Sequence, residues 1–195
     1  MKDMELQEER QTNEKKRRFG LELLDFVKIL LVCFIVAFGI KTFIARPVFV
    51  EGSSMYPTLQ DGEFGFTNLL GLSLEGVNRG DIVIVEEGSE YWVKRVIGLP
   101  NETIECRDNV VYINGEPLDE PYLDSDYVKD IENNQGYFTS DFEAIELGSD
   151  EYFVMGDNRV VSADSRVVGP FSRSQIVGKG VLVLLPLDQL GYKNQ

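Results

Sequence analysis

The sequence contains no histidine, and this absence limits its possible chemistry more than any other feature of its composition. Without histidine, a Ser-His-Asp triad, a Cys-His pair and a histidine-ligated metal site are all excluded. A serine nucleophile in this chain would therefore need a different general base. Nothing else in the composition indicates a metal or another cofactor, and we expect none.

Cysteine is almost as scarce, since Cys33 and Cys106 are the only two in 195 residues. Two cysteines cannot form a disulfide framework, and Cys33 lies in the most apolar stretch of the chain. We therefore expect no redox chemistry. A chain of this length with 43% hydrophobic residues can bury one core of ordinary size, which indicates one globular unit.

Positive charge is scarce outside the N-terminal region. Residues 1–46 contain nine Lys and Arg against seven Asp and Glu, whereas residues 47–195 contain ten against twenty-six. A domain this acidic repels a phosphate backbone, so the charge argues against nucleic-acid binding. The distribution is typical of the solvated surface of an exported domain.

The N-terminal region has a polar segment followed by an apolar one. Residues 1–18 lack periodicity and end in four basic residues, so we interpret them as a disordered cytoplasmic tail. Residues 19–45 contain the uninterrupted apolar run Ile29–Ile40, which reaches membrane-spanning length if Lys28 and Lys41 snorkel. We interpret this segment as a transmembrane anchor, with a cleavable signal peptide and a buried core helix as alternatives. The preceding basic cluster places the N-terminus in the cytoplasm and the remaining chain outside.

The remaining residues, 46–195, have the pattern of a mainly β domain. Short runs of branched and aromatic residues, bounded by Gly, Asn or Pro, predict strands over residues 47–50, 80–85, 91–97, 110–113 and 181–185. Asn114-Gly115 follows the fourth run and predicts a hairpin turn. Residues 101–150 are predicted as a less regular β insertion, of which residues 116–150 form an irregular surface segment.

The first candidate catalytic segment is GSSMYPTL, residues 52–59. Ser54 lies between Gly52 and Pro57 on a constrained turn, where its hydroxyl can project and nearby backbone N–H groups can face a developing oxyanion. Serines in such loops are also ordinary turn formers, so the segment alone does not identify a nucleophile.

The second candidate is Lys94, in the predicted strand 91–97. Alternation places Trp92 and Val96 on the same face as Lys94. Burial among them would lower the lysine pKa from about 10.4 toward a range where the amine can act as a neutral base. The alternative is that Lys94 extends past its apolar neighbours to water.

A third cluster, residues 155–166, combines two acids, two arginines, an asparagine and two serines. These side chains can form a hydrogen-bonded loop that holds a neighbouring lysine. They are equally typical of a solvated loop with an internal ion pair.

Four segments together resemble, in chain order, the conserved boxes of bacterial type I signal peptidases, or leader peptidases. The segments are Ser54–Leu59, Arg79–Val83, Val93–Pro100 and, within Gly156–Arg166, GDNR and SADSR. The resemblance runs from the anchor to about Leu185 and is to the single-anchor form typical of Gram-positive bacteria. It implies a mainly β, signal-peptidase/LexA-like fold. It also implies a serine-lysine endopeptidase that cuts signal peptides from secretory preproteins after small residues of the Ala-x-Ala type, through an acyl-enzyme.

The resemblance implies a role for individual residues. Ser54 corresponds to the nucleophile, Lys94 to the general base and Ser162 to a hydroxyl that orients the lysine. The supporting ionic framework corresponds to Asp157, Arg95, Asp164 and Arg166. The apolar wall of the pockets for small substrate residues corresponds to Val48, Val50, Met55, Leu59 and Val93, although a core role is the alternative for each.

Two positions depart from the family pattern. Gly52 stands where some relatives have a serine whose hydroxyl helps the oxyanion hole, so the Ser54 backbone N–H would carry more of that role, with Ser53 as a further candidate. Val160 and Val161 replace residues that are commonly polar, which leaves the conformation of that loop open.

The implied setting is a single-pass protein of the cell membrane whose partners are preproteins and membrane lipid, without nucleic acid. A self-cleaving repressor of the LexA type would need a basic helix-turn-helix, which the acidic domain does not provide. A penicillin-binding type of enzyme needs Ser-x-x-Lys, which is absent. A non-catalytic tethered binding protein would not require both Ser54 and Lys94.

Overall fold

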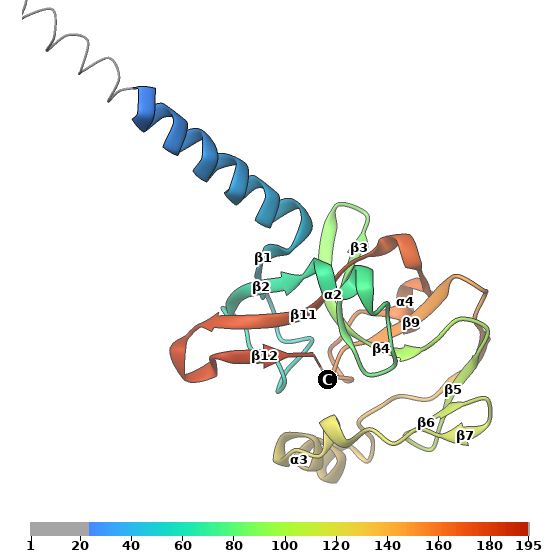
Figure 1. Cartoon of the computed structure of the whole chain (residues 1–195). Helices are drawn as coiled ribbons and strands as arrows, with labels where there is room; N and C mark the ends of the chain where they lie inside the picture. Colours follow the sequence, from blue (N-terminus) through green and yellow to red (C-terminus); the bar gives the residue numbers. More distant parts are fainter. Residues whose placement is uncertain (1–23, 195) are drawn as a thin grey trace, which may run out of the picture. The chain divides into compact units, whose positions relative to one another are not determined.

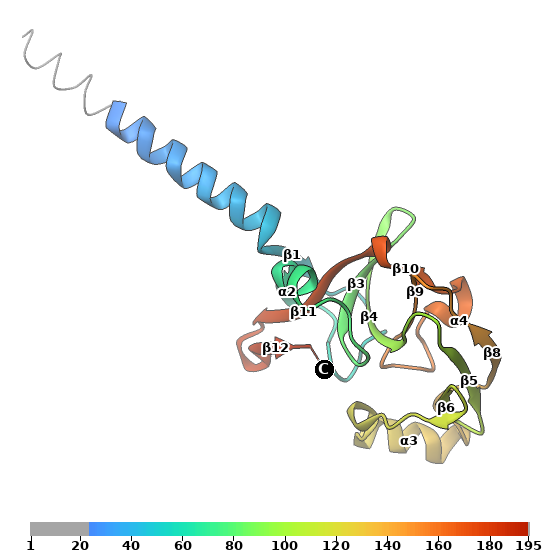
Figure 2. The same ribbon diagram turned by 45° about the vertical axis from the view of Figure 1, so that its right-hand side comes forward.

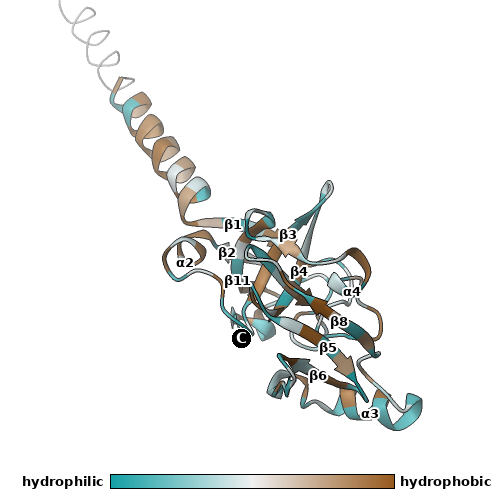
Figure 3. Ribbon diagram, turned by 90° about the vertical axis from the view of Figure 1, so that its right-hand side faces the viewer, coloured by the Kyte–Doolittle hydropathy of each residue, from teal (hydrophilic) through white to brown (hydrophobic). Residues whose placement is uncertain are grey.

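The computed structural model describes residues 24–194, which divide into two compact units between Phe43 and Ile44. The predicted tail, residues 1–18, lies outside the described residues. The described part of the first unit is one apolar helix, Leu24–Phe43, drawn mostly in brown in Figure 3. At about 1.5 Å per residue its 20 residues extend about 30 Å, the thickness of a bilayer's hydrocarbon core. The helix ends two residues before the predicted limit, because Ala45 already begins a strand.

The second unit is mainly β, as predicted (Figure 1). Within residues 44–194 its larger sheet has eight strands, all paired antiparallel, in the order β1-β2-β11-β3-β4-β9-β10, with β12 also paired to β11. The strands are β1 (Ala45–Phe49), β2 (Phe64–Asn68), β3 (Ile82–Glu87), β4 (Glu90–Gly98), β9 (Glu151–Met155), β10 (Phe171–Ser172), β11 (Ile176–Leu185) and β12 (Gly191–Lys193).

A smaller antiparallel sheet is formed by the insertion between β4 and β9, in the order β7-β6-β5-β8. Its strands are β5 (Thr103–Arg107), β6 (Val110–Ile113), β7 (Glu116–Pro117) and β8 (Phe142–Glu146). The helices of the unit are α2 (Leu69–Leu74), α3 (Asp126–Gln135) and α4 (Ser165–Val168), with 3₁₀ turns at Pro121–Leu123, Arg173–Gln175 and Leu187–Gln189. Figure 2 shows the insertion with α3 at its end.

The core fixes β3 in place because side chains pack against both of its faces, and β4 is held by its pairing with β3. Ile82 and Ile84 pack with Met55 and Leu59 beneath the turn that follows β1, whereas Val83 packs into a cluster on the opposite face. This alternation is the side-chain period of a strand, and burial of both sides explains the continuous apolar run. A third cluster joins the two sheets through the end of β4 and the start of β5.

The insertion is more regular than predicted. Asn114 and Gly115 form the two-residue turn between β6 and β7, with φ of 52° and 84°, as the sequence indicates. The irregular segment predicted over residues 116–150 instead contains α3 and β8. Ser125 caps the start of α3 by accepting a hydrogen bond from Val128 N, and Gly136 ends it with a left-handed φ of 82°.

Candidate active site

Ser54 and Lys94 come together from separate elements. Ser54 lies in the turn after β1, Lys94 lies in the middle of β4, and Nζ of Lys94 is 2.8 Å from Oγ of Ser54. Lys94 is only 4% exposed. An uncharged amine at this distance can accept the hydroxyl proton, so the pair has the geometry of a nucleophile and its general base.

Burial sets the charge state of Lys94. Desolvation lowers the lysine pKa to about 8, while Asp164 opposes this shift and Arg166 adds to it. The ammonium nitrogen lies 5.5 Å from the centre of the Trp92 ring, which agrees with the shared strand face predicted from alternation. About a tenth of Lys94 is therefore uncharged at pH 7, far more than for a lysine with the ordinary pKa of about 10.4.

The turn that carries Ser54 is anchored at both ends. Gly52 has a φ of 85°, which favours glycine, and its N–H donates to Asp61 Oδ1 at 2.7 Å. On the other side, Met55 and Leu59 are buried and are joined by a backbone hydrogen bond of 2.9 Å. These contacts hold the Ser54 hydroxyl above the core.

Asn158 binds the backbone on both sides of the Ser54 Cα. Its backbone N–H donates to the Ser54 carbonyl at 3.0 Å, and its side-chain Nδ2 donates to the Ser53 carbonyl at 3.1 Å. Asn158 is 2% exposed. The loop after β9 therefore fixes the Ser54 backbone directly, a role that sequence reasoning missed.

Arg95 and Asp157 form a fully buried ion pair beside the pair of candidate catalytic residues. Arg95 Nε and NH2 donate to the two Asp157 oxygens at 2.8 and 2.6 Å, and NH1 donates to the Gly80 carbonyl at 2.8 Å. Thr58 in the Ser54 turn donates to Asp157 Oδ2 at 2.5 Å. The ion pair thus joins β4 to the turn that holds Ser54.

Asp164 and Arg166 form a second ion pair next to Lys94. Arg166 Nε and NH2 each lie 2.8 Å from an Asp164 oxygen, and Gly156 N donates to Oδ2 at 3.0 Å. Burial alone would raise the pKa of Asp164, but the hydrogen bonds and charge of Arg166 hold it below its ordinary value. Ser162, at 9% exposure, donates to the Ala163 carbonyl at 3.4 Å, and residues 24–194 show no hydrogen bond from it to Lys94.

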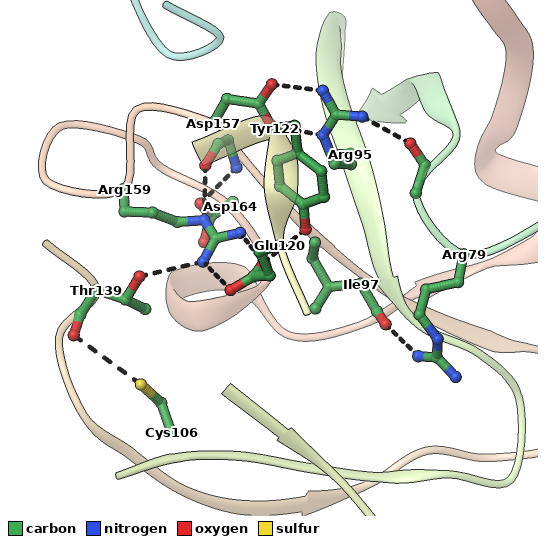
Figure 4. A network of polar contacts seen from close by, with 12 residues as sticks. Arg79, Arg95, Ile97, Cys106, Glu120, Tyr122, Thr139, Asp157, Arg159 and Asp164 are labelled. Atoms are coloured by element: carbon green, nitrogen blue, oxygen red, sulfur yellow. Dashed lines mark hydrogen bonds and ion pairs between the residues drawn. The ribbon is translucent and has the colours of Figure 1, made fainter. Parts of the chain in front are cut away.

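The insertion adds a buried network that the sequence did not reveal (Figure 4). Arg159 binds Glu120 through an ion pair, Thr139 Oγ1 at 3.1 Å and the Gly156 carbonyl at 3.1 Å. Tyr122 donates to Glu120 Oε1 at 2.6 Å and places its ring centre 4.0 Å from the Arg95 guanidinium carbon. Sequence gives no signal for Glu120, because it is one of many acidic residues in a segment that looks solvated.

A cavity of about 620 Å³ opens beside Ser54 and Lys94. Its wall includes Phe49, Val50, Met55, Tyr91 and Val93. Val48 lines an adjoining cavity of about 290 Å³, to which Val93 also contributes. Leu59 is fully buried and lines neither cavity, so it supports the wall from below rather than forming it.

Two strand edges border the cavities. Within the described chain, β1 pairs only with β2, and residues Glu90–Lys94 of β4 pair only with β3, because pairing with β9 begins at Arg95. An extended peptide could therefore form backbone hydrogen bonds with either edge. Across residues 24–194, no three His, Cys, Asp or Glu side chains gather where they could hold a metal ion.

Known proteins resemble this chain over most of its length. A family model described as signal peptidase, peptidase S26, matches residues 23–185. Signal peptidase I S of Bacillus subtilis strain 168 is 37% identical over 88% of this chain and 94% of its own length, and signal peptidase I T of the same strain is 39% identical over 94% and 97%. A crystal structure of a signal peptidase I from Enterococcus faecalis V583 is 34% identical, covers 53% of this chain and 95% of its own, and has a TM-score of 0.48. The chain therefore belongs to the signal peptidase family, peptidase S26, whose members are serine endopeptidases that remove signal peptides.

Proposed function

We propose that this membrane-anchored enzyme cleaves secretory preproteins with Ser54 as nucleophile and Lys94 as general base. The observation that carries the proposal is the 2.8 Å separation between Lys94 Nζ and Ser54 Oγ, with the lysine pKa lowered to about 8 by burial. A serine nucleophile needs a general base within hydrogen-bond distance of its hydroxyl. Because the chain has no histidine, that base must be another side chain, and Lys94 meets the requirement.

The reaction proceeds in two halves. Neutral Lys94 takes the Ser54 proton as Oγ attacks the scissile carbonyl, and the resulting lysinium then protonates the leaving amine, which frees the mature N-terminus. The signal peptide remains as an ester on Ser54. Lys94 next takes a proton from water, whose oxygen attacks the ester carbonyl, and the proton returns to Ser54 as the acid leaves.

The oxyanion would be bound by the Ser54 backbone N–H. Gly52 has no hydroxyl to contribute, so this N–H carries a larger share than in relatives with serine there. Ser162 is proposed to orient Lys94 once substrate closes the site. The ion pairs of Arg95 with Asp157 and of Arg166 with Asp164 hold the surrounding loops.

Selection of small residues follows from the cavity wall. Val50, Met55 and Val93 line the cavity at the nucleophile, and Val48 and Val93 line the adjoining one. A peptide extended between β1 and β4 would place alternate side chains against this apolar wall, which favours an Ala-x-Ala sequence before the cut.

The anchor has a physical purpose in this proposal. Signal peptides carry an apolar segment that resides in the bilayer, so an enzyme anchored in the same membrane meets its substrate at a raised effective concentration. The four basic residues at positions 15–18 favour a cytoplasmic N-terminus and an extracytoplasmic catalytic unit in the cell membrane, in contact with its lipid. Protease treatment of intact cells should digest residues 46–195 if this orientation is right and spare them if it is reversed.

Cleavage of an Ala-x-Ala preprotein tests the assigned mechanism. The full-length enzyme in detergent is compared with Ser54→Ala and Lys94→Ala, and with Lys129→Ala, which removes an exposed lysine of α3, as a matched control. Both active-site variants should lose cleavage while the control retains it. Undiminished cleavage by either active-site variant would eliminate the proposed pair, and a chain that binds the preprotein without cutting it would be a binding protein.

A further inference from the structure

The structure joins the insertion to the nucleophile's backbone through two polar side chains. We propose that Tyr127, on helix α3 of the insertion, is a positioning residue of the oxyanion hole and acts through Asn158 to hold the peptide group between Ser53 and Ser54. This inference rests on the proposed function, in which the Ser54 N–H binds the oxyanion.

One peptide group couples the Ser53 carbonyl to the Ser54 N–H. The Ser53 carbonyl and the Ser54 N–H belong to the same planar unit and point in opposite directions, so fixing the carbonyl also fixes the N–H. Two donors fix that carbonyl, Asn158 Nδ2 and the Tyr56 N–H, each at 3.1 Å. These bonds also polarise the unit and strengthen the N–H as a donor.

The orientation of the Asn158 amide determines which partner its oxygen needs. Only its nitrogen can donate to the Ser53 carbonyl, so its oxygen must face the other way and needs a donor of its own. The Tyr127 hydroxyl lies 3.2 Å from Asn158 Oδ1 and supplies that donor. Because Asn158 is 2% exposed, loss of the hydroxyl leaves an acceptor that water cannot readily satisfy.

Aromatic packing holds Tyr127 in place. Its ring meets Tyr56, two residues after the nucleophile, edge to face with the centres 4.8 Å apart, and meets Phe138 at 6.4 Å in the same manner. The Asn109 side chain ties α3 to the β5–β6 turn by donating to Glu132 at 2.7 Å. A rigid insertion thus supports the tyrosine that supports Asn158.

The test substitutes Tyr127→Phe, which keeps the ring and removes only the hydroxyl. Tyr137→Phe is the matched control, because Tyr137 belongs to the same insertion, is 47% exposed and shows no side-chain hydrogen bond within residues 24–194. Loss of one complete oxyanion donor lowers kcat about 10²–10³-fold. Tyr127→Phe leaves the Ser54 N–H in place but holds it less firmly, so kcat should fall by a smaller factor of about 3 to 10. We expect this loss in kcat for the full-length enzyme with an Ala-x-Ala preprotein. KM and the apparent pKa of the acid limb should be unchanged. The melting temperature should fall by about 2–4 °C, because the buried Asn158 oxygen loses its donor, so kcat is measured well below the unfolding transition.

Asn158→Ala completes the test, since it removes the amide but retains the backbone N–H that binds the Ser54 carbonyl. Adding Tyr127→Phe to this variant should cause no further loss, because the two residues act in series. The inference is overturned by a wild-type kcat in Tyr127→Phe, by an equal loss in Tyr137→Phe, or by losses that multiply in the double variant. If Asn158→Ala does not fold, the Tyr127→Phe kinetics decide. Failure of the proposed function would be distinct, since wild-type cleavage would then survive Ser54→Ala.

Discussion

The backbone of Gly156 lies against the backbone of Ser54. A β-carbon at position 156 would overlap the Ser54 carbonyl oxygen and the Ser162 hydroxyl. The same carbonyl accepts the Asn158 N–H, so the loop after β9 and the turn after β1 meet where no side-chain atom can be added. Gly156 is therefore required by a close approach to Ser54 and not by a turn.

Gly156→Ala is expected to displace Ser54, the proposed nucleophile. Displacement of a reacting group by about 1 Å can cost about 10²-fold in rate, and overpacking of this kind costs about 1–3 kcal/mol in stability. Steady-state cleavage and thermal unfolding would measure both. Gly191→Ala is the control, because a β-carbon there meets open space. Equal activity of the two variants would contradict the close approach.

Activity should depend on pH through Lys94. In the proposed mechanism the neutral amine is the reactive form, and its pKa is about 8, so kcat/KM should rise about tenfold per pH unit below pH 8 and level off above it. A pH–rate profile from pH 5 to 10 measures this limb. A limb controlled by a group of pKa near 4 would instead indicate a carboxylate base.

Lys94→Met should make the folded protein more stable while abolishing cleavage. Because folding lowers the lysine pKa from about 10.4 to about 8, the wild type carries a cost of up to about 3 kcal/mol at pH 7. Wild-type stability depends on pH because the unfolded chain binds a proton at Lys94 more tightly than the folded chain does. Between about pH 8 and 10.4 the unfolded chain binds more protons, so wild-type stability rises with pH. The advantage of Lys94→Met in denaturant unfolding should therefore be largest below pH 8 and shrink toward pH 10.4. A variant less stable than wild type at pH 7 would contradict the burial of Lys94.

Asp157→Asn should destabilise the catalytic unit strongly. It leaves the fully buried Arg95 without its counter-charge, which typically costs about 3–5 kcal/mol. The matched control is Asp124→Asn, which removes an exposed ion pair to Lys129 and should not change the melting temperature measurably. Similar melting temperatures for the two variants would show that the Arg95 pair does not support the fold.

Sequence reasoning was most successful where information is local. Alternation in residues 91–97 correctly placed Lys94 with Trp92, because a strand's period needs only neighbouring residues. The match to four family boxes indicated that Ser54 and Lys94 lie close together, and the structure places them at hydrogen-bond distance. The local chemistry of each segment alone left other interpretations open.

What could not be predicted depends on contacts distant in sequence. Tyr127 and Glu120 look like members of an acidic surface segment, and their contacts with Asn158 and Arg159 are visible only once the insertion is folded. Leu59 was assigned to the pocket wall through the family resemblance, with a core role as the alternative, and the structure buries its side chain completely. Helix α3 was missed although Ser125 and Gly136 are ordinary start and stop signals, because its apolar periodicity is weak.

Direct titration of Lys94 tests the central claim. NMR of the full-length enzyme with ¹³C-labelled lysine would follow the Lys94 Cε signal, assigned by its loss in Lys94→Met, from pH 5 to 11. We predict a midpoint near pH 8 that coincides with the acid limb of kcat/KM. A midpoint near 10.4, with activity already at its plateau two pH units lower, would show that Lys94 is not the base.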